Sequence, residues 1–311
     1  MKSWRYVYSG LQVISELELP EWESFLHPEP FAATDVLILV EAAQEREPAA
    51  VETLTYISAT EYRFFVPGTA SYCVKNGSEI IVSPVTGAGS CELRLFLLGS
   101  AWGALCYQRG LLAIHASVVC IGDNATVFCG HPGKGKSTLT AWLAARGHAL
   151  VSDDLCCIDM SLQERTSVYP STPHFRLWSD ALDVLGYKSY RLERDHFRFD
   201  KFILPWLGEM IEQPVPLRAI YLLEWGEFNV QRMSGLNALQ GFVSAATYRG
   251  FLLDRMGLSG SYWQRCLELV RRVPVWQLTR PKDLTQMDTT LTILLSHWQS
   301  NIPAEKAVEK A

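Results

Sequence analysis

The chain has 311 residues, of which 48% are hydrophobic and 20% are charged, and its formal net charge is −5. This length allows a large core and two domains, because single domains usually run to roughly 100–200 residues. The negative balance and the lack of a Lys/Arg cluster exclude an extended basic surface, so we do not expect a nucleic-acid partner.

The sequence carries no sign of export or of a membrane span. The N-terminus, MKSWRYVYSG, lacks an apolar signal core, and no run reaches the ~18 apolar residues that a span needs. We therefore expect a cytoplasmic protein with no membrane partner. None of the eight cysteines forms C-x-x-C or stands near a His at zinc spacing, so they are expected to be reduced core residues.

Residues 1–91 predict a small, β-rich α+β domain without a nucleotide motif. Strands are expected at 36–40, 61–66, 70–74 and 80–83, and Lys75-Asn76-Gly77-Ser78 is a strong hairpin turn. The function of this domain does not follow from the sequence.

Residues 92–300 are expected to form the second domain. A helix over 92–109 has an apolar centre of ~12 residues, which is too short for a bilayer and suits a buried helix between the domains. A strand over 111–121, a turn at 122–124 and a strand over 125–129 follow.

The next segment is a candidate phosphate-binding loop. Residues 130–137, GHPGKGKS, match G-x-x-x-x-G-K-[ST], with a strand before them and an amphipathic helix, 137–146, after them. The glycines let consecutive N–H groups turn toward a phosphate, and the helix adds its N-terminal dipole. Lys136 is expected to reach the β- and γ-phosphates of a nucleotide, and the Ser137 hydroxyl to bind Mg²⁺. The expected cofactor-binding residues here are Gly130, His131, Pro132, Gly133, Lys134, Gly135, Lys136, Ser137 and Thr138.

Lys134 leaves two interpretations open. It is an additional cation inside the loop, so it could contact phosphate. It could equally be solvated, which is the commoner state of a lysine and the interpretation that we favour.

Two adjacent carboxylates follow the next predicted strand. That strand runs over 148–152, and Asp153 and Asp154 are expected at its carboxyl end, where ligands of α/β sheets gather. Phosphate-loop proteins commonly hold the metal through a second-strand Asp, so Asp153 is a candidate metal ligand beside Ser137. The alternative is a helix cap or a turn.

The remaining segments are less specific. Residues 169–178 are turn-rich and aromatic, a short helix covers 179–185, and residues 187–206 are rich in Arg and aromatics. The last of these could bind a phosphorylated ligand or a peptide, or form a solvated strand pair. Further on we expect a strand pair at 217–225 and 230–233, helices over 237–249, 261–272 and 283–298, a strand at 275–278, and disorder from Asn301 to 311.

The segments LLAIHASVV and FCGHPGKGKSTLTAWLAARGHALVSDD together resemble the catalytic domain of the HPr kinase/phosphorylase superfamily. The similarity lies in the upstream His115, the loop and the Asp pair. It implies an α/β fold, a P-loop mixed-sheet kinase domain of HPr-kinase type, and ATP- and Mg²⁺-dependent phosphorylation of a serine hydroxyl. It also implies catalytic roles for Lys136, His115, Asp153 and Asp154, with Asp154 as proton acceptor, and a phosphate contact for Lys201.

Two features differ from the HPr enzymes. Thr138 stands where they have a Glu, and their Glu-Ile-Arg-Gly signature is missing near 175–183. The layout is more similar to shorter HPr-kinase-like proteins of peptide natural-product pathways, including kinases of lasso-peptide precursors. The resemblance then implies a peptide or protein partner that bears the acceptor Ser, recognised by the N-terminal domain and the 169–206 segment. Relatives in the HPr branch form hexamers, and a homo-oligomer is left open.

Two other functions remain open: a nucleotide-binding regulator without kinase activity, and a small-molecule kinase. A GTPase is disfavoured, because no N-K-x-D motif follows the loop.

Overall fold

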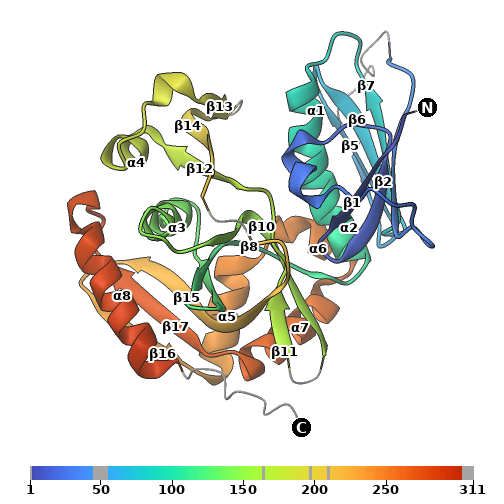
Figure 1. The fold of residues 1–311 in the computed structure, drawn as a ribbon. Helices are drawn as coiled ribbons and strands as arrows, with labels where there is room; N and C mark the ends of the chain where they lie inside the picture. The colour runs from blue at the N-terminus through green and yellow to red at the C-terminus, as the bar shows by residue number, and fades with distance from the viewer. Residues whose placement is uncertain (1, 45–54, 163–164, 196–197, 209–210, 303–311) are drawn as a thin grey trace.

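The first seven strands form one mixed sheet, in the order β1-β2-β3-β7-β6-β5-β4. The structure, a computed structural model, describes residues 2–44, 55–162, 165–195, 198–208 and 211–302 (Figure 1). All four strands expected in this part are present, and Asn76 and Gly77 have positive φ angles of 53° and 62°, as a tight hairpin turn requires. The elements are β1 (Trp4–Tyr8), β2 (Leu11–Ser15), the 3₁₀ helix η1 (Pro20–Phe25), β3 (Val36–Val40), β4 (Tyr56–Ile57), β5 (Glu61–Val66), β6 (Ala70–Lys75) and β7 (Glu79–Pro84).

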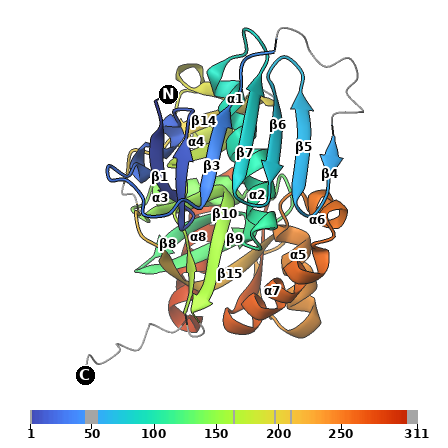
Figure 2. The same ribbon diagram turned by 90° about the vertical axis from the view of Figure 1, so that its right-hand side faces the viewer.

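A helical rod connects this sheet to the rest of the molecule. It consists of α1 (Ser90–Phe96), a π turn (Leu97–Ala101) and α2 (Trp102–Gln108), and it packs against the first sheet (Figure 2). On that side the Tyr72 hydroxyl donates to the Leu93 carbonyl at 2.9 Å, and the Trp22 and Trp102 rings lie 4.9 Å apart. On the other side the Tyr107 hydroxyl donates to the Tyr248 carbonyl. The predicted buried helix is confirmed, although the π turn within it was not expected.

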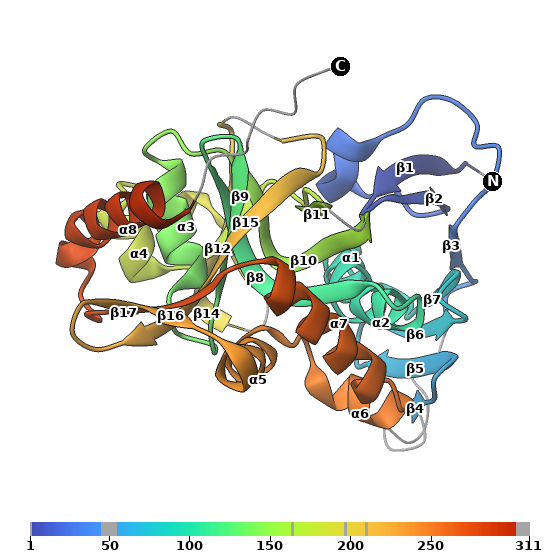
Figure 3. The same ribbon diagram turned by 90° about the horizontal axis from the view of Figure 1, so that it is seen from below.

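The second sheet has seven strands in the order β11-β10-β8-β9-β15-β17-β16, and β11 also pairs with the start of β15. Helices α3 and α8 cover one face, and α5 and α7 cover the other (Figure 3). The strands are β8 (Leu112–Ile121), β9 (Asn124–Cys129), β10 (Leu150–Leu162), β11 (Arg165–Val168), β15 (Val215–Trp225), β16 (Asn229–Met233) and β17 (Val275–Arg280). The helices are α3 (Lys136–Ala144), α5 (Gly235–Ala246), α6 (Gly250–Met256), α7 (Ser259–Arg272), the 3₁₀ helix η5 (Leu284–Gln286) and α8 (Met287–Asn301).

A third, three-stranded sheet lies beside α3. Its order is β12-β14-β13, and Phe175 and Leu177 of its edge strand pack with Ala141 and Ala144 of α3. Lys201 of its central strand lies close enough to the glycine-rich loop for its charge to act on Lys136. Its elements are β12 (His174–Trp178), α4 (Ser179–Val184), the 3₁₀ helix η4 (Ser189–Arg191), β13 (Glu193–Asp195) and β14 (Arg198–Pro205). The fold is thus mixed α/β.

The carboxylate pair does not end its strand, contrary to the prediction. Strand β10 runs for 13 residues, and Asp153 and Asp154 lie in its first half. The strand continues because Leu155 and the apolar residues after it keep pairing with β8 and stay buried.

Three other predictions are wrong. Strands β15 and β16 do not pair with each other, because β17 lies between them, parallel to β15 and antiparallel to β16. The helix predicted over 237–249 ends at Ala246, since Arg249 has a positive φ of 46° and a new helix starts at Gly250. Disorder from Asn301 is wrong for the first two residues, because Asn301 is helical and Ile302 is buried; residues 303–311 lie outside the described residues.

Of the helices in the described ranges, none combines the length and the apolar character that crossing a bilayer requires.

Candidate active site

The glycine-rich loop, residues 130–137, connects the end of β9 to the start of α3. Gly133 and Gly135 have φ angles of 84° and 75°, a region that residues with a side chain rarely occupy. At Gly130 a Cβ atom would lie 3.1 Å from the Cβ of Lys134 and 3.3 Å from the Leu223 carbonyl oxygen. Gly133 and Gly135 are therefore needed for this backbone path, and the space at Gly130 is tight for a side chain. The path ends at the N-terminus of α3.

Lys136 lies across the loop. Its side chain is buried, and its Nζ donates to the Gly130 carbonyl at 2.7 Å. Burial lowers the pKa of the Lys136 ammonium, and the charges of Asp153 and Asp154 partly offset this effect. The ammonium is thus within electrostatic reach of both carboxylates.

The other residues of the loop differ in exposure. Lys134 is neither free in solvent nor turned into the loop, since its Nζ forms an ion pair of 2.5 Å with Glu224 at the end of β15. His131, Pro132 and Gly133 are exposed, whereas Thr138 is buried in α3.

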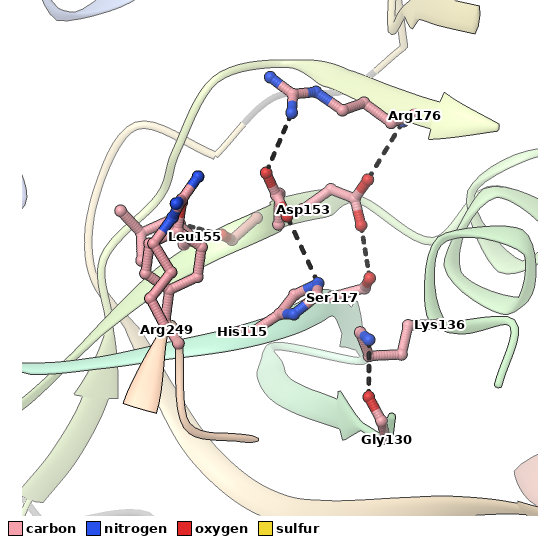
Figure 4. Close-up of polar contacts among 11 residues, drawn as sticks. His115, Ser117, Gly130, Lys136, Asp153, Leu155, Arg176 and Arg249 are labelled. Atoms are coloured by element: carbon pink, nitrogen blue, oxygen red, sulfur yellow. Dashed lines mark hydrogen bonds and ion pairs between the residues drawn. The ribbon is translucent and has the colours of Figure 1, made fainter. Parts of the chain in front are cut away.

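The register between β8 and β10 places Asp153 opposite Ser117. The Asp153 side chain is buried; one carboxylate oxygen accepts from the Ser117 hydroxyl, and the other from the Arg176 backbone N–H at 3.3 Å (Figure 4). Burial raises the pKa of the Asp153 carboxyl, while hydrogen bonds from the Ser117 and Ser137 hydroxyls lower it. The two expected Mg²⁺ ligands, Ser137 and Asp153, therefore face each other.

Asp154 has an unusual backbone conformation for a strand residue, with φ at 81°. Its carboxylate lies 3.4 Å from the His115 Nε2 and 3.3 Å from an Arg176 Nη1. Partial burial raises the pKa of this carboxyl, but the charges of Arg176, His115 and Lys201 outweigh that effect and bring it to about 2. Asp154 is consequently ionised at neutral pH.

Lys201 comes to the site from a different element. It pairs with Trp178 in the register between β12 and β14, and its charge lowers the pKa of Lys136 as well as that of both carboxyls. The structure thus brings together His115, Lys136, Ser137, Asp153, Asp154 and Lys201.

Three polar residues of this site, Ser117, Arg176 and His174, were not expected from the sequence. Ser117 could have been inferred from the sequence, because it stands two positions from His115 in the same strand and so points to the same face. Arg176 had no signal beyond its charge, since its role depends on the third sheet packing against α3. Burial lowers the pKa of the nearby His174 to about 4, with a contribution from the Arg176 charge, so this ring is neutral at pH 7.

A cavity of about 150 Å³ lies on the side of the carboxylates that faces the first sheet. Its walls include Asp153, Asp154 and Arg176, and also residues of η1 and of the helical rod. The residues contributed by the N-terminal part include Glu21, Trp22, Cys91, Arg94 and Leu98. A group that enters this cavity contacts the carboxylate pair and the N-terminal part at once.

The donor set fits Mg²⁺ and not a metal held by protein ligands alone. In the described part of the chain, no three or more His, Cys, Asp or Glu side chains form a metal site. Ser137 and Asp153 supply two oxygen ligands, and Mg²⁺ commonly takes one or two from the protein and the rest from phosphate and water. Six of the eight cysteines are buried, as expected, while Cys73 is half-buried and Cys91 is exposed.

These features define a mixed α/β protein in which a glycine-rich loop, a buried lysine and a carboxylate pair converge. Neither a family model nor a curated protein matches the chain. Among solved structures, the HPr(Ser) kinase/phosphatase from Coxiella burnetii is similar with a TM-score of 0.34 and 12% identity, over 60% of this chain and 90% of that chain. This distant similarity assigns neither a family nor an activity.

Proposed function

We propose that the protein is an ATP-dependent kinase that transfers the γ-phosphate to a serine hydroxyl of a peptide or protein. The observation that carries the proposal is the position of the Asp153–Asp154 pair, between Lys136 of the glycine-rich loop and the cavity toward the first sheet. A phosphate donor has its binding groups on one side of the carboxylates, and an acceptor has room on the other.

On the donor side, the loop amides and the N-terminus of α3 bind the phosphates. Lys136 exchanges the Gly130 carbonyl for a phosphate oxygen, and Lys201 adds a second positive charge. Ser137 and Asp153 are the residues that would hold Mg²⁺, which neutralises charge on the transferred group when bound.

On the acceptor side, Asp154 orients the hydroxyl. With a pKa of about 2 it is a weak base, which suits a transition state in which bond formation to the acceptor lags behind cleavage. Asp154 therefore accepts a hydrogen bond from the hydroxyl and takes its proton late in the transfer. Arg176 and His115 hold the carboxylate in place.

The acceptor is proposed to be a peptide or protein because residues from two separate parts of the chain line the cavity. Residues of η1 and α1 and residues of the third sheet, Glu193 and Arg194, meet there. A serine on an extended segment can enter while the flanking residues contact both parts. A precursor peptide of a ribosomal natural product, such as a lasso peptide, is one acceptor of this kind.

The experiment uses γ-labelled ATP, Mg²⁺ and a library of serine peptides, with a library that has Ala in place of Ser as control. We expect label only in the serine library, and none with Asp154→Asn or Lys136→Ala. Label in both libraries would reject serine as the acceptor. Binding of ATP without label in any peptide would favour the nucleotide-binding regulator, and label in a metabolite pool alone would favour a small-molecule kinase.

A further inference from the structure

Arg280, the last residue of β17, lies behind the glycine-rich loop. Its side chain is only 2% exposed, and its Nη2 donates to the Lys134 carbonyl at 3.1 Å and to the Gly135 carbonyl at 3.2 Å. The guanidinium carbon lies 4.3 Å from the centre of the Trp225 ring. One side chain thus binds two consecutive carbonyl groups of the loop.

The positive charge of Arg280 has no anionic partner in the part of the chain that the structure describes, because none of the ion pairs there involves Arg280. Its Nε is buried and has no hydrogen-bond partner. Burial lowers the pKa of the guanidinium to about 10, so the group is still charged at pH 7. A buried charge without a counterion is costly, so the buried guanidinium favours binding of an anion at the glycine-rich loop.

The two carbonyl contacts also bear on the direction of two amides. The Lys134 carbonyl accepts from Arg280, while the Gly135 carbonyl accepts from Arg280 and from the Leu139 N–H of α3 at 3.0 Å. In a trans peptide group the C=O and the N–H point in opposite directions. Because the carbonyls of Lys134 and Gly135 point toward Arg280, the N–H groups of Gly135 and Lys136 point away from it. No hydrogen bond within the described ranges uses either N–H group.

Gly135 is required for this arrangement. A Cβ atom at position 135 would lie 2.6 Å from the Arg280 Nη2 and 3.2 Å from the Trp225 Cη2. The second glycine of the motif therefore allows the guanidinium to approach the loop, in addition to providing a positive φ angle.

We propose that Arg280 is a positioning residue for the phosphate site. It directs the Gly135 amide, and together with α3 the Lys136 amide, toward the phosphates of a nucleoside triphosphate, and it adds a buried positive charge behind them. The inference depends on the proposed function only in that the loop binds a polyphosphate. It assigns a role in phosphate binding to a residue that is distant from the loop in sequence.

The test uses the full chain and calorimetric titration with ATP and with inorganic tripolyphosphate, beside thermal melting. Arg280→Met is expected to weaken both ligands by about tenfold or more, since hydrogen bonds that involve a charged group contribute more than neutral ones. Arg280→Lys keeps the positive charge but loses the planar guanidinium that binds two carbonyl groups, and we expect an intermediate loss of affinity. Arg272→Met is the control, because Arg272 is half-buried in α7 and contacts Glu268 and the Met160 carbonyl instead of the loop.

A lower melting temperature with unchanged affinities in Arg280→Met would reduce Arg280 to a structural residue and overturn the proposal. If Arg280→Met does not fold, Arg280→Lys decides in the same way, since unchanged affinities there overturn the proposal. Weakened binding in the Arg280 variants, with no phosphate transfer by the wild type, supports the role proposed for Arg280 and rejects the proposed kinase activity. Phosphate transfer by the wild type, with unchanged affinities in the variants, rejects the role proposed for Arg280 and leaves the proposed kinase activity in place.

Discussion

Asp154 combines a charged side chain with a backbone conformation that most residues avoid. Its φ of 81° is of the kind that Gly, Asn and Asp tolerate and that costs other residues about 1–2 kcal/mol. Strained residues of this kind cluster at functional sites, where the surrounding structure holds them in place. The unusual backbone conformation of Asp154 thus accompanies the placement of its carboxylate beside Arg176 and His115.

This strain separates two substitutions that remove the same charge. We expect Asp154→Ala to be less stable than Asp154→Asn by about 1 kcal/mol, because only Asn tolerates the positive φ. Urea unfolding of both variants measures the difference. Equal free energies of unfolding would show that the conformation is not strained in solution. Neither variant should transfer phosphate.

His174 gives the fold a dependence on pH. Its pKa of about 4 in the folded protein lies below the value of about 6.5 expected in the unfolded chain. Between these two values the unfolded chain binds a proton that the folded protein lacks, so stability falls as the pH falls. Asp154 affects stability at lower pH than His174 does. The stabilising effect of its carboxylate is complete above about pH 4 and is lost as the pH falls toward 2.

We expect His174→Gln to flatten the decrease in the free energy of unfolding between pH 7 and pH 5. Urea titrations of the wild type and the variant at both pH values provide the measurement. The comparison between the proteins is decisive, because burial raises the pKa of Asp153 and its effect on the slope has the opposite sign. A slope that is unchanged in the variant contradicts the assignment to His174.

At the scale of elements, the helical rod connects the core to the site. Its π turn places Leu98 and Gly99 in the wall of the cavity. One turn further on, Gly103 packs directly on the Tyr248 ring, which in turn lies 6.2 Å from the His115 ring in an edge-on contact. Packing along the rod therefore affects the position of His115.

Two glycines of the rod allow a matched comparison. An Ala Cβ at position 103 would lie 2.7 Å from the Tyr248 ring, whereas at position 99 it would lie 3.4 Å from the Tyr248 hydroxyl. We expect Gly103→Ala to lose about 1–3 kcal/mol, as overpacked cores do. Gly99→Ala should change stability by less than about 1 kcal/mol, because Ala favours a helix over Gly. Urea unfolding of both variants tests this, and equal losses would contradict the contact with Tyr248.

At the scale of the whole molecule, the cavity beside the carboxylate pair exists only because η1 and α1 of the N-terminal part lie against β10 and the third sheet. Cys91 stands at its wall in the first turn of α1, and it is the exposed member of the eight cysteines. A reagent on this thiol should block the acceptor without reaching the glycine-rich loop.

We expect modification of Cys91 with a bulky maleimide to lower phosphate transfer by about tenfold or more, because misplacing an acceptor is costly in rate. The affinity for ATP should not change. The variant Cys91→Ser, treated in the same way, is the control, and a Cys73→Ser background removes the half-buried thiol. Wild-type transfer by the labelled protein would place the acceptor elsewhere.

The sequence by itself determined the local features of this protein. It predicted four of the seven strands of the first sheet, the buried helix, and the strand–loop–helix unit around Lys136, because hydrophobic periodicity and glycine requirements act over a few residues. Strands β1, β2 and β4 were not predicted. It also indicated Asp153 and Asp154 as candidate site residues, and the resemblance to the HPr kinase/phosphorylase superfamily added His115.

Only the tertiary structure decided which distant segments meet. The continuation of β10 beyond Asp154, the place of β17 between β15 and β16, and the positions of Arg176 and Arg280 all depend on pairing and packing between segments far apart in the chain. Such contacts have no local sequence pattern, because the residues around a charged side chain in a strand do not show which distant segment it will contact. The cavity between the carboxylates and the first sheet is of the same kind: residues of η1, the rod and the third sheet form its wall.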